Sequence, residues 1–312
     1  MRRYRAYGLD VASDRALPLR PSRSEAEPCL TIACADRGPA QPPSGQGRRE
    51  LVRSGADWTL RYDNREGGWM AFDYSSGKRR LLVSGSVEWE VLEGPLTGLV
   101  FGVKLRLEGA SLLHGACLRI GGRAVAILGG SGHGKSTLAA ASVALGAELL
   151  TEDLLLLRRG PHGFEAEPGA TTLHLLADSH RHLAARLPPA GDGTSVNGDG
   201  KVRLVLPGSC AEPVRLSALY ILEPPGAGDG TRLQRLSGTD AIGRLAGQLY
   251  GSAWISPLGS GDLAFCARVA REVPVFALSR PWALEGVLET AELVRTHAPA
   301  EPRQRADPSS RT

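Results

Sequence analysis

Residues 127–137 have the sequence Ile-Leu-Gly-Gly-Ser-Gly-His-Gly-Lys-Ser-Thr, which contains a complete phosphate-binding loop pattern (P-loop, Walker A), G-x-x-x-x-G-K-S. Residues 124–128 form a short apolar run that predicts a buried strand, and residues 137–145 are rich in Ala and Leu without a helix breaker. A loop between a strand and a helix directs backbone N–H groups and the positive end of the helix toward an anion. This part of the chain therefore predicts an α/β fold built around a nucleotide site.

Each position of the loop has an expected task. The glycines let the backbone approach a polyphosphate, Lys135 reaches the outer phosphates, and the Ser136 hydroxyl is expected to bind Mg²⁺. His133 occupies a variable position, and we expect its side chain to face solvent or a partner. The nucleotide-binding residues that the pattern predicts are Gly129, Gly130, Ser131, Gly132, His133, Gly134, Lys135, Ser136 and Thr137.

An antiparallel partner is predicted directly before the loop strand. Two apolar runs, 116–120 and 123–128, are joined by Gly121-Gly122, a pair typical of a tight hairpin turn. An ordinary doubly wound nucleotide fold instead enters its loop strand through a parallel crossover from a helix. Further strands are predicted at 147–150, 202–206, 216–222 and 274–278, a second hairpin at 154–157 and 164–167, and helices at 239–250 and 281–297. The predicted sheet is therefore mixed.

The chain divides into three parts. Residues 1–108 are predicted to form a smaller β-rich domain, because short alternating runs recur between turn residues and no helical period interrupts them. These runs are 29–34, 57–62, 69–74, 86–92 and 99–107. Residues 109–298 carry the phosphate loop and are assigned to the nucleotide-binding domain. The polar tail at 299–312 is predicted to be disordered.

Composition narrows the class of partner. The chain of 312 residues has a formal net charge of +4 and its arginines are spread along it, so neither a nucleic acid nor a membrane is predicted as a partner. No stretch approaches the roughly 18 apolar residues of a membrane span, and the first residues lack the apolar core of a secretory signal. We therefore predict a cytoplasmic protein and leave its oligomeric state open, including a homo-oligomer.

A pair of carboxylates, Glu152-Asp153, follows the strand that is predicted after the loop helix. A carboxylate at the end of a strand beside a phosphate loop can hold Mg²⁺ or accept a proton from an attacking hydroxyl. Adjacent residues on an extended strand point to opposite faces, so the two share one role only if the strand has ended and turned. A solvated pair at a strand end is the alternative.

Two further side chains are expected at the edge of the site. His114 begins the hairpin strand beside the loop strand, where a protonated imidazole would favour negative charge; a structural histidine is the alternative. Residues 188–201 are rich in Gly, Pro and Asp and are predicted to form a flexible loop, from which Lys201 contacts substrate or phosphate. Loops of this kind often close over a ligand.

Segments 113–120, 121–122, 129–137 and 146–153 resemble, in order and spacing, the core of the HPr kinase/phosphorylase family. The resemblance implies a phosphate-loop fold with a mixed sheet, similar to that of phosphoenolpyruvate carboxykinase, and phosphorylation of a protein serine. It also places the family's histidine at His114, its loop lysine at Lys135, and its paired aspartates at Glu152 and Asp153.

The chain also departs from that family. The first acid is Glu, one methylene longer than Asp, so the assignment of the base to Glu152 or Asp153 stays open. The family's substrate-binding signature is not recognisable at 168–173, and HPr is not the expected acceptor. The chain looks more like HPr-kinase-like proteins encoded with lasso peptide biosynthesis, which share an opening like residues 4–13 and a strand like residues 200–205. Those enzymes phosphorylate a serine hydroxyl near the carboxyl end of a precursor peptide.

Together the motifs and the resemblance predict an ATP- and Mg²⁺-dependent kinase that acts on a serine hydroxyl of a peptide or small protein. Lys135 and the loop amides are expected to hold the phosphates, and Ser136 and Asp153 to hold Mg²⁺. Glu152 is expected to accept the hydroxyl proton, and His114 to support the site. The alternatives are a regulatory or assembly protein that hydrolyses its nucleotide, and a kinase of a small molecule such as free serine.

Overall fold

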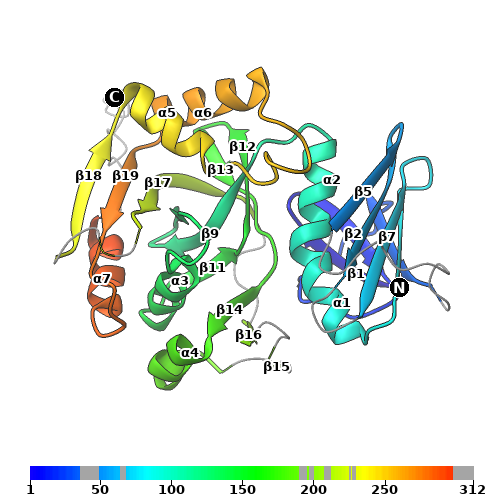
Figure 1. Cartoon of the computed structure of the whole chain (residues 1–312), viewed down its shortest axis with the longest axis horizontal. Helices are drawn as coiled ribbons and strands as arrows, with labels where there is room; N and C mark the ends of the chain where they lie inside the picture. The colour runs from blue at the N-terminus through cyan, green and yellow to red at the C-terminus, as the bar shows by residue number, and fades with distance from the viewer. Residues whose placement is uncertain are drawn as a thin grey trace, which may run out of the picture.

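The computed structural model describes residues 1–35, 49–63, 68–189, 195–196, 200–206, 212–224, 226 and 230–297. The predictions for the tail at 299–312 and for most of the loop at 188–201 lie outside the described residues. Within the described ranges the chain forms two sheets of eight strands each and a third sheet of three strands. Figure 1 shows the first sheet at one end of the molecule and the other two sheets, with most of the helices, at the other.

The first sheet is built from the N-terminal part of the chain. Its strands are β1 (Arg2–Ala6), β2 (Leu9–Ser13), β3 (Arg20–Pro21), β4 (Leu30–Cys34), β5 (Arg49–Ser54), β6 (Asp57–Asp63), β7 (Trp69–Ser75) and β8 (Arg80–Gly85). Their order is β3-β1-β2-β4-β8-β7-β6-β5, with parallel pairs only at β2–β4 and β4–β8. On β7, the alternating residues Met70, Phe72 and Tyr74 are buried in the core. The strands predicted at 29–34, 57–62 and 69–74 are confirmed.

The strands predicted at 86–92 and 99–107 are wrong. A continuous helical segment lies there: α1 (Trp89–Pro95), a π-helical turn η1 (Leu96–Val100) and α2 (Phe101–Leu107). Its buried residues follow a helical spacing of three or four: Leu92, Leu96, Val100 and Val103. A proline and two glycines within 94–98 concealed that period, while short alternating stretches imitated strands. The segment packs its apolar face on the first sheet and lies between this sheet and the rest of the chain (Figure 1).

The second sheet carries the phosphate loop. Its strands are β9 (Leu112–Ile120), β10 (Arg123–Leu128), β11 (Glu148–Thr151), β12 (Leu154–Gly160), β13 (Gly163–Ala166), β17 (Val214–Leu222), β18 (Arg232–Leu236) and β19 (Val275–Ser279). The predicted hairpin is confirmed, with Ile120 opposite Arg123 across the turn at 121–122. Because β10 pairs antiparallel with β9 and parallel with β17, the sheet is mixed, as predicted.

The third sheet contains β14 (Thr172–Leu176), β15 (Ser195–Val196) and β16 (Lys201–Val205). The remaining helices are α3 (Lys135–Ala144), α4 (Ala177–Leu183), the 3₁₀ turn η2 (Ala184–Arg186), α5 (Gly238–Ala246), α6 (Ser260–Glu272) and α7 (Val287–His297). Helix α6 and strand β18 were not predicted from the sequence, and α7 begins later than the predicted helix at 281–297. No helix in the described ranges is long and apolar enough to cross a membrane.

Helices cover both faces of the second sheet. Val125 and Ile127 of β10 pack in one apolar cluster with residues of α3 and α7, whereas Ala124, Ala126 and Leu128 pack in another with residues of α5 and α6. Every residue of β10 is buried, as expected for a strand with both faces covered. This packing fixes the strand from which the phosphate loop emerges.

The direction of the strands determines where the site lies. Strands β10 and β11 are both antiparallel to β9, so they run in the same direction as each other, and β17 and β19 run parallel to β10. Their carboxyl ends therefore meet at one edge of the sheet, where β9 begins. Ligands bind at such an edge in open α/β sheets.

The first sheet lies before residue 108 and the other two sheets lie after it, but buried side chains from the two parts pack against each other. Leu112 and Leu154 belong to the same buried cluster as Phe72 and Val100 of the N-terminal part. The buried hydroxyl of Tyr7 accepts the Ala170 N–H at 3.4 Å, and burial raises the pKa of Tyr7 to about 12. The N-terminal part is thus attached directly to the part that carries the phosphate loop.

Arg20 makes a second buried connection between the two parts. Its Nη1 donates to the Gly169 carbonyl at 2.7 Å, and its Nη2 donates to the carbonyls of Leu149 and Leu150 at 2.9 and 3.1 Å. The side chain is almost fully enclosed. A side chain of the first sheet therefore satisfies carbonyls of β11, the strand that ends at the acidic pair.

Candidate active site

The phosphate loop connects β10 to α3 as predicted. Gly134 precedes the helix with φ of 82°, a left-handed value, and a Cβ at this position would overlap the Arg280 guanidinium. The backbone angle therefore requires glycine, whereas the Arg280 guanidinium is the end of a flexible side chain. The first turn of α3 leaves N–H groups without helical partners, and Lys135, Ser136 and Thr137 line a cavity there. The positive end of the helix faces the same space.

Lys135 is held at the loop. Its Nζ donates to the carbonyls of Gly129 and Gly130, at 2.9 and 3.0 Å. Burial lowers the pKa of Lys135, while the charges of Asp153 and Glu152 oppose this shift. The ammonium therefore lies in the loop and near both acids, where the outer phosphates of a nucleotide would be bound.

The prediction that His133 faces solvent or a partner is wrong. Its Nδ1 lies 3.2 Å from the Gly130 N–H and 3.2 Å from the Leu222 carbonyl oxygen, so the ring folds back between the loop and the end of β17. The loop turns so tightly that a Cβ at Gly130 would meet this ring. Through these two contacts the His133 ring connects the loop to the end of β17 and stabilises the loop conformation.

The chain turns sharply at the acidic pair. Strand β11 ends at Thr151, Asp153 has a φ of 64°, and the Leu154 N–H donates to the Glu152 carbonyl at 2.8 Å. A hydrogen bond over two residues with a positive φ between them describes a γ-turn, which is rare and strained for a residue other than glycine. The strand has therefore ended before the two acids, and the chain turns at them. On an extended strand their side chains would point to opposite faces, whereas here both carboxylates lie in one site.

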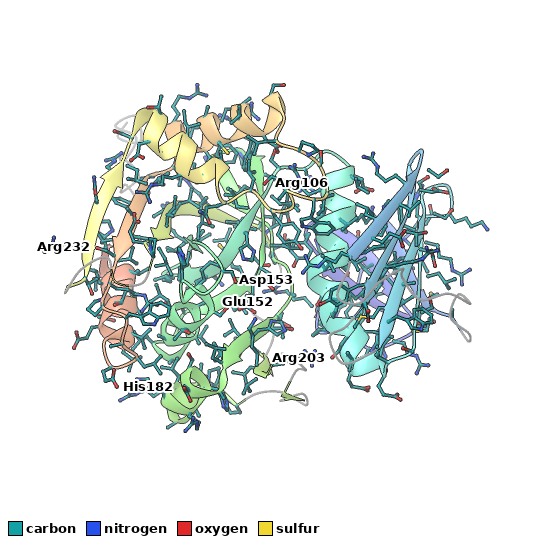
Figure 2. The ribbon with its side chains drawn as sticks, viewed as in Figure 1. Arg106, Glu152, Asp153, His182, Arg203 and Arg232 are labelled. Carbon is teal, nitrogen blue, oxygen red and sulfur yellow. The ribbon has the colours of Figure 1, made fainter. Side chains whose placement is uncertain are left out.

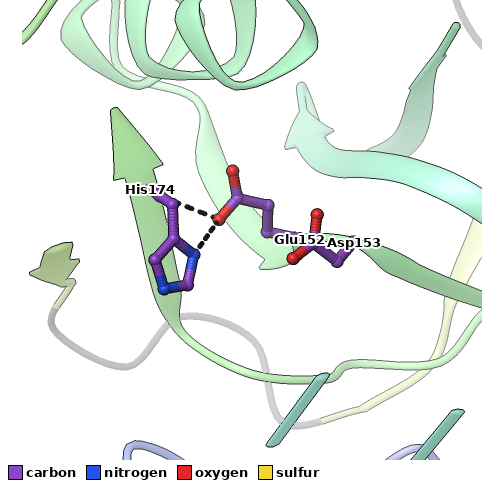
Figure 3. Close-up of side chains that lie close together, drawn as sticks. All are labelled: Glu152, Asp153 and His174. Atoms are coloured by element: carbon purple, nitrogen blue, oxygen red, sulfur yellow. Dashed lines mark hydrogen bonds and ion pairs between the residues drawn. The ribbon is translucent and has the colours of Figure 1, made fainter. Parts of the chain in front are cut away.

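A third residue joins this pair. Ligand atoms of Glu152, Asp153 and His174 all lie within 4.8 Å of one another. Figure 2 shows both acids near the centre of the molecule, and Figure 3 shows His174 of β14 facing Glu152. His174 was not predicted as a site residue. It comes from the third sheet, and nothing in the local sequence indicates which strand would lie opposite Glu152.

The Glu152 carboxylate is fixed by His174. The side chain of Glu152 is 4% exposed, and its Oε2 accepts both the backbone N–H and the Nδ1–H of His174, each at 2.9 Å. Its other oxygen, Oε1, is buried without a hydrogen-bond partner. A buried carboxylate oxygen without a partner is costly unless a cation or a proton completes it.

The charges of this pair depend on each other. Burial raises the pKa of Glu152, while His174 and the neighbouring Ser136 hydroxyl oppose this shift. Burial alone would lower the pKa of His174, but its hydrogen bond to Glu152 and the charge of Glu152 outweigh burial and raise it. The oxygens of Glu152, Asp153 and Ser136 are the type of ligand that Mg²⁺ prefers, so the residues present fit this ion.

Asp153 is held from the opposite side by β9. Its carbonyl oxygen accepts the Nδ1–H of His114 at 3.1 Å and the Gly115 N–H at 3.2 Å. Burial and the charge of Lys135 lower the pKa of His114, against the opposing effect of Asp153. This shift disfavours the protonated imidazole and favours the structural role that the sequence left as the alternative. The contact of His114 with Asp153 fixes the turn.

One cavity of about 540 Å³ connects these groups. Its walls include the phosphate loop with Lys135, the turn with Asp153, and His114. Lys201 also lines the cavity. It is the first residue of β16 and does not belong to a flexible loop. Glu152 is not part of the cavity wall. The structure thus brings Lys135, Asp153, His114 and Lys201 to one cavity. Of the two acids, Asp153 faces this cavity and Glu152 lies behind its wall.

Sequence reasoning also missed Arg280 and Trp282, which line the cavity beside the phosphate loop. They follow directly after β19, at the same edge of the sheet as the end of β10. Their place after the last predicted strand was the available signal, because side chains that follow parallel strands gather at the ligand-binding edge.

No family model and no curated protein matches the chain. Among solved structures, the chain is similar to one described as the HPr(Ser) kinase/phosphatase from Coxiella burnetii, with 13% sequence identity and a TM-score of 0.32. The match covers 60% of this chain and 95% of that one. The chemistry of the site therefore rests on its own residues and geometry.

Proposed function

We propose that the chain is a kinase that uses ATP and Mg²⁺ to phosphorylate a serine hydroxyl of a peptide or small protein. The observation that carries this proposal is that Asp153 lines the same cavity as Lys135 and the first turn of α3. Phosphoryl transfer to a hydroxyl needs an anion-binding loop and a proton acceptor in one space. The cavity also has the size of a ligand site, for which roughly 300–1,000 Å³ is usual.

In this proposal Asp153 is the base, and Glu152 with Ser136 holds Mg²⁺, the reverse of the sequence-based assignment. Asp153 faces the cavity, whereas Glu152 lies behind it with Oε2 bound by His174. The unpartnered Oε1 and the neighbouring Ser136 hydroxyl favour a cation at Glu152. Mg²⁺ bound there supplies positive charge against the charge that develops on the phosphate oxygens.

The residues of the chain then have separate tasks. Asp153 accepts the proton of the acceptor hydroxyl while the hydroxyl oxygen forms a bond to the γ-phosphorus. The bond between that phosphorus and the β–γ bridging oxygen breaks, and Lys135 with the loop N–H groups stabilises the charge left on ADP. His114 is a positioning residue, because it contacts the Asp153 carbonyl and holds the turn.

A peptide acceptor suits the cavity wall better than a free amino acid does. Leu176 is 60% exposed and lines the cavity, so it offers an apolar contact for a neighbouring side chain of a peptide. The narrower acceptor, a serine near the carboxyl end of a lasso peptide precursor, is supported only by the resemblance of residues 4–13 and 200–205.

The test is transfer from ATP to a defined acceptor. The full chain is incubated with ATP, Mg²⁺ and a peptide that ends in a carboxyl-terminal serine, and the peptide mass is measured; a peptide with Ala in place of that serine and free serine are the controls. We expect the mass of one added phosphate on the serine peptide alone, and its loss in Lys135→Ala. Release of free phosphate without a modified peptide would support the hydrolase alternative, and equally efficient phosphorylation of free serine would support a small-molecule kinase.

A further inference from the structure

The cavity extends to both sides of the phosphate loop. Along the sheet, β9 separates β10 from β11, and β17 separates β10 from β19. With strands about 4.8 Å apart, the acidic turn after β11 and the segment after β19 each lie roughly 10 Å from the loop strand, on opposite sides. The segment 280–284 therefore forms the wall that lies away from the acids.

The positions of Lys135 and the acids determine which way a bound nucleotide would point in this cavity. The loop lysine reaches the outer phosphates, and both acids act on Lys135 from their side. The γ-phosphate must lie near Asp153, because the acceptor hydroxyl and its base meet there. The nucleoside then extends away from the acids, toward the wall formed by 280–284.

Trp282 is the large side chain on that wall. It lines the cavity, and a Cβ built on Gly134 would lie 3.6 Å from its ring, so the indole is beside the N-terminus of α3. It is 55% exposed, compared with 36% for Trp254, which does not line the cavity. The neighbouring cavity residues Ala283 and Leu284 are apolar. An exposed indole in a ligand cavity is a surface on which a flat ring can stack.

Arg280 holds the indole in this position. Its guanidinium carbon lies 5.3 Å from the centroid of the Trp282 ring, which is a cation–π distance. Its Nη2 donates to the His133 carbonyl at 3.3 Å, and its Nη1 donates to the Pro281 carbonyl at 3.4 Å. The same guanidinium therefore contacts both the phosphate loop and Trp282, so the indole is fixed relative to the loop.

We propose that Trp282 is the stacking surface for the base of the nucleotide, and that Arg280 positions it. This inference rests on the proposed function, because the direction of the nucleotide follows from a γ-phosphate near Asp153. Its test measures nucleotide binding alone and requires neither transfer nor an acceptor. Stacking on an aromatic ring depends little on the identity of the base, because every base has a π-face.

The experiment compares two ligands that share phosphates and differ in the base. Affinities for Mg-ATP and for inorganic tripolyphosphate with Mg²⁺ are measured by calorimetry for the full wild-type chain and for Trp282→Ala, Trp282→Phe and Trp254→Ala. For Trp282→Ala we expect roughly a 5- to 150-fold loss in ATP affinity, the range for one stacked base. Its tripolyphosphate affinity should be unchanged, Trp282→Phe should recover most of the loss, and Trp254→Ala should behave as wild type.

Two results would overturn the inference. One is ATP affinity that does not change in Trp282→Ala, and the other is an equal loss for ATP and tripolyphosphate, which would show that the substitution disturbs the loop. Failure of the proposed function has a different signature. If wild type binds ATP with the expected dependence on Trp282 but modifies no acceptor, the stacking surface stands and the kinase proposal does not.

Discussion

His174 and Glu152 are joined by two hydrogen bonds to one oxygen: the backbone N–H and the ring Nδ1–H of His174 both lie 2.9 Å from Oε2 of Glu152. The two residues come from different sheets, since His174 belongs to β14 and Glu152 follows β11. The carboxylate is thereby fixed with Oε1 in a buried position without a partner. This arrangement matches the way in which residues behind a metal ligand orient it.

Removing the His174 ring should weaken the binding of Mg²⁺ without abolishing folding. His174→Ala keeps the backbone N–H but loses the ring bond, so we expect roughly a 10- to 100-fold higher Mg²⁺ concentration for half-maximal transfer, the usual cost of losing such a partner. His174→Asn retains a side-chain N–H and should recover part of the loss. A Mg²⁺ titration of peptide phosphorylation measures this, and an unchanged Mg²⁺ requirement in His174→Ala would contradict the orienting role.

Substitution of Asp153 and of Glu152 should affect different steps, transfer and Mg²⁺-dependent ATP binding respectively. Asp153→Asn should lower transfer by roughly 10²- to 10⁴-fold, the usual loss for a general base, while Mg-ATP affinity stays close to wild type. Glu152→Gln should instead weaken Mg²⁺-dependent ATP binding. Binding by calorimetry and transfer by peptide mass separate the two effects. The opposite pattern would restore the assignment made from the sequence.

Gly169 lies where a methyl group has no space. A Cβ there would overlap the Thr151 hydroxyl and the Tyr7 ring, both fully buried, so Gly169→Ala should lower the free energy of unfolding by about 1–3 kcal/mol. Gly243→Ala is the matched control, because this exposed position within α5 has no neighbour within 4 Å of an added Cβ. Alanine there should stabilise the chain by about 0.5–1 kcal/mol. Urea unfolding measures both, and equal effects would contradict the close approach.

The Arg20 contacts predict that the first sheet supports β11. Arg20→Met removes this donor from the carbonyls of Leu149, Leu150 and Gly169, although the Leu150 carbonyl still accepts the Gly169 N–H at 2.9 Å. Losing hydrogen bonds from a buried guanidinium should lower the free energy of unfolding by about 1–3 kcal/mol. Arg3→Met removes a single exposed hydrogen bond to Ala26 and should change stability by less than about 0.5 kcal/mol. Denaturant unfolding of both variants tests this difference, and similar losses would refute it.

Asp262 gives a pH dependence of stability with a definite sign. Its hydrogen bonds to Arg106, the largest cause, outweigh burial and lower the pKa of Asp262 from 3.8 to about 2. A carboxylate with a lowered pKa stabilises the fold above its unfolded value, and this contribution is lost as the pH falls from about 4 to 2. The stability difference between wild type and Asp262→Asn should therefore shrink by about 1–2 kcal/mol between pH 5 and pH 2.5.

Unfolding midpoints at several pH values in that range check this expectation. Glu292→Gln is the control, because Glu292 pairs with Arg295 on an exposed surface, where such pairs contribute little. A stability difference for Asp262→Asn that stays constant from pH 5 to pH 2.5 would show that the Arg106 pair does not lower the pKa of Asp262 in solution.

The sequence determined the features that depend on local pattern. The phosphate loop, the hairpin at 121–122 and the strand before the acidic pair follow from glycine positions and short apolar runs, which act over a few residues. The helical segment at 89–107 was missed, because alternation over short stretches resembles a strand when glycines and a proline interrupt the helical period.

The roles within the site were decided only by tertiary structure. The left-handed turn at Asp153 is maintained by His114 of another strand, and Glu152 is fixed by His174 of another sheet. Likewise, Arg280 reaches the loop from a segment 147 residues away. No local pattern specifies these contacts, because they depend on which strands become neighbours when the apolar faces of the whole chain are buried.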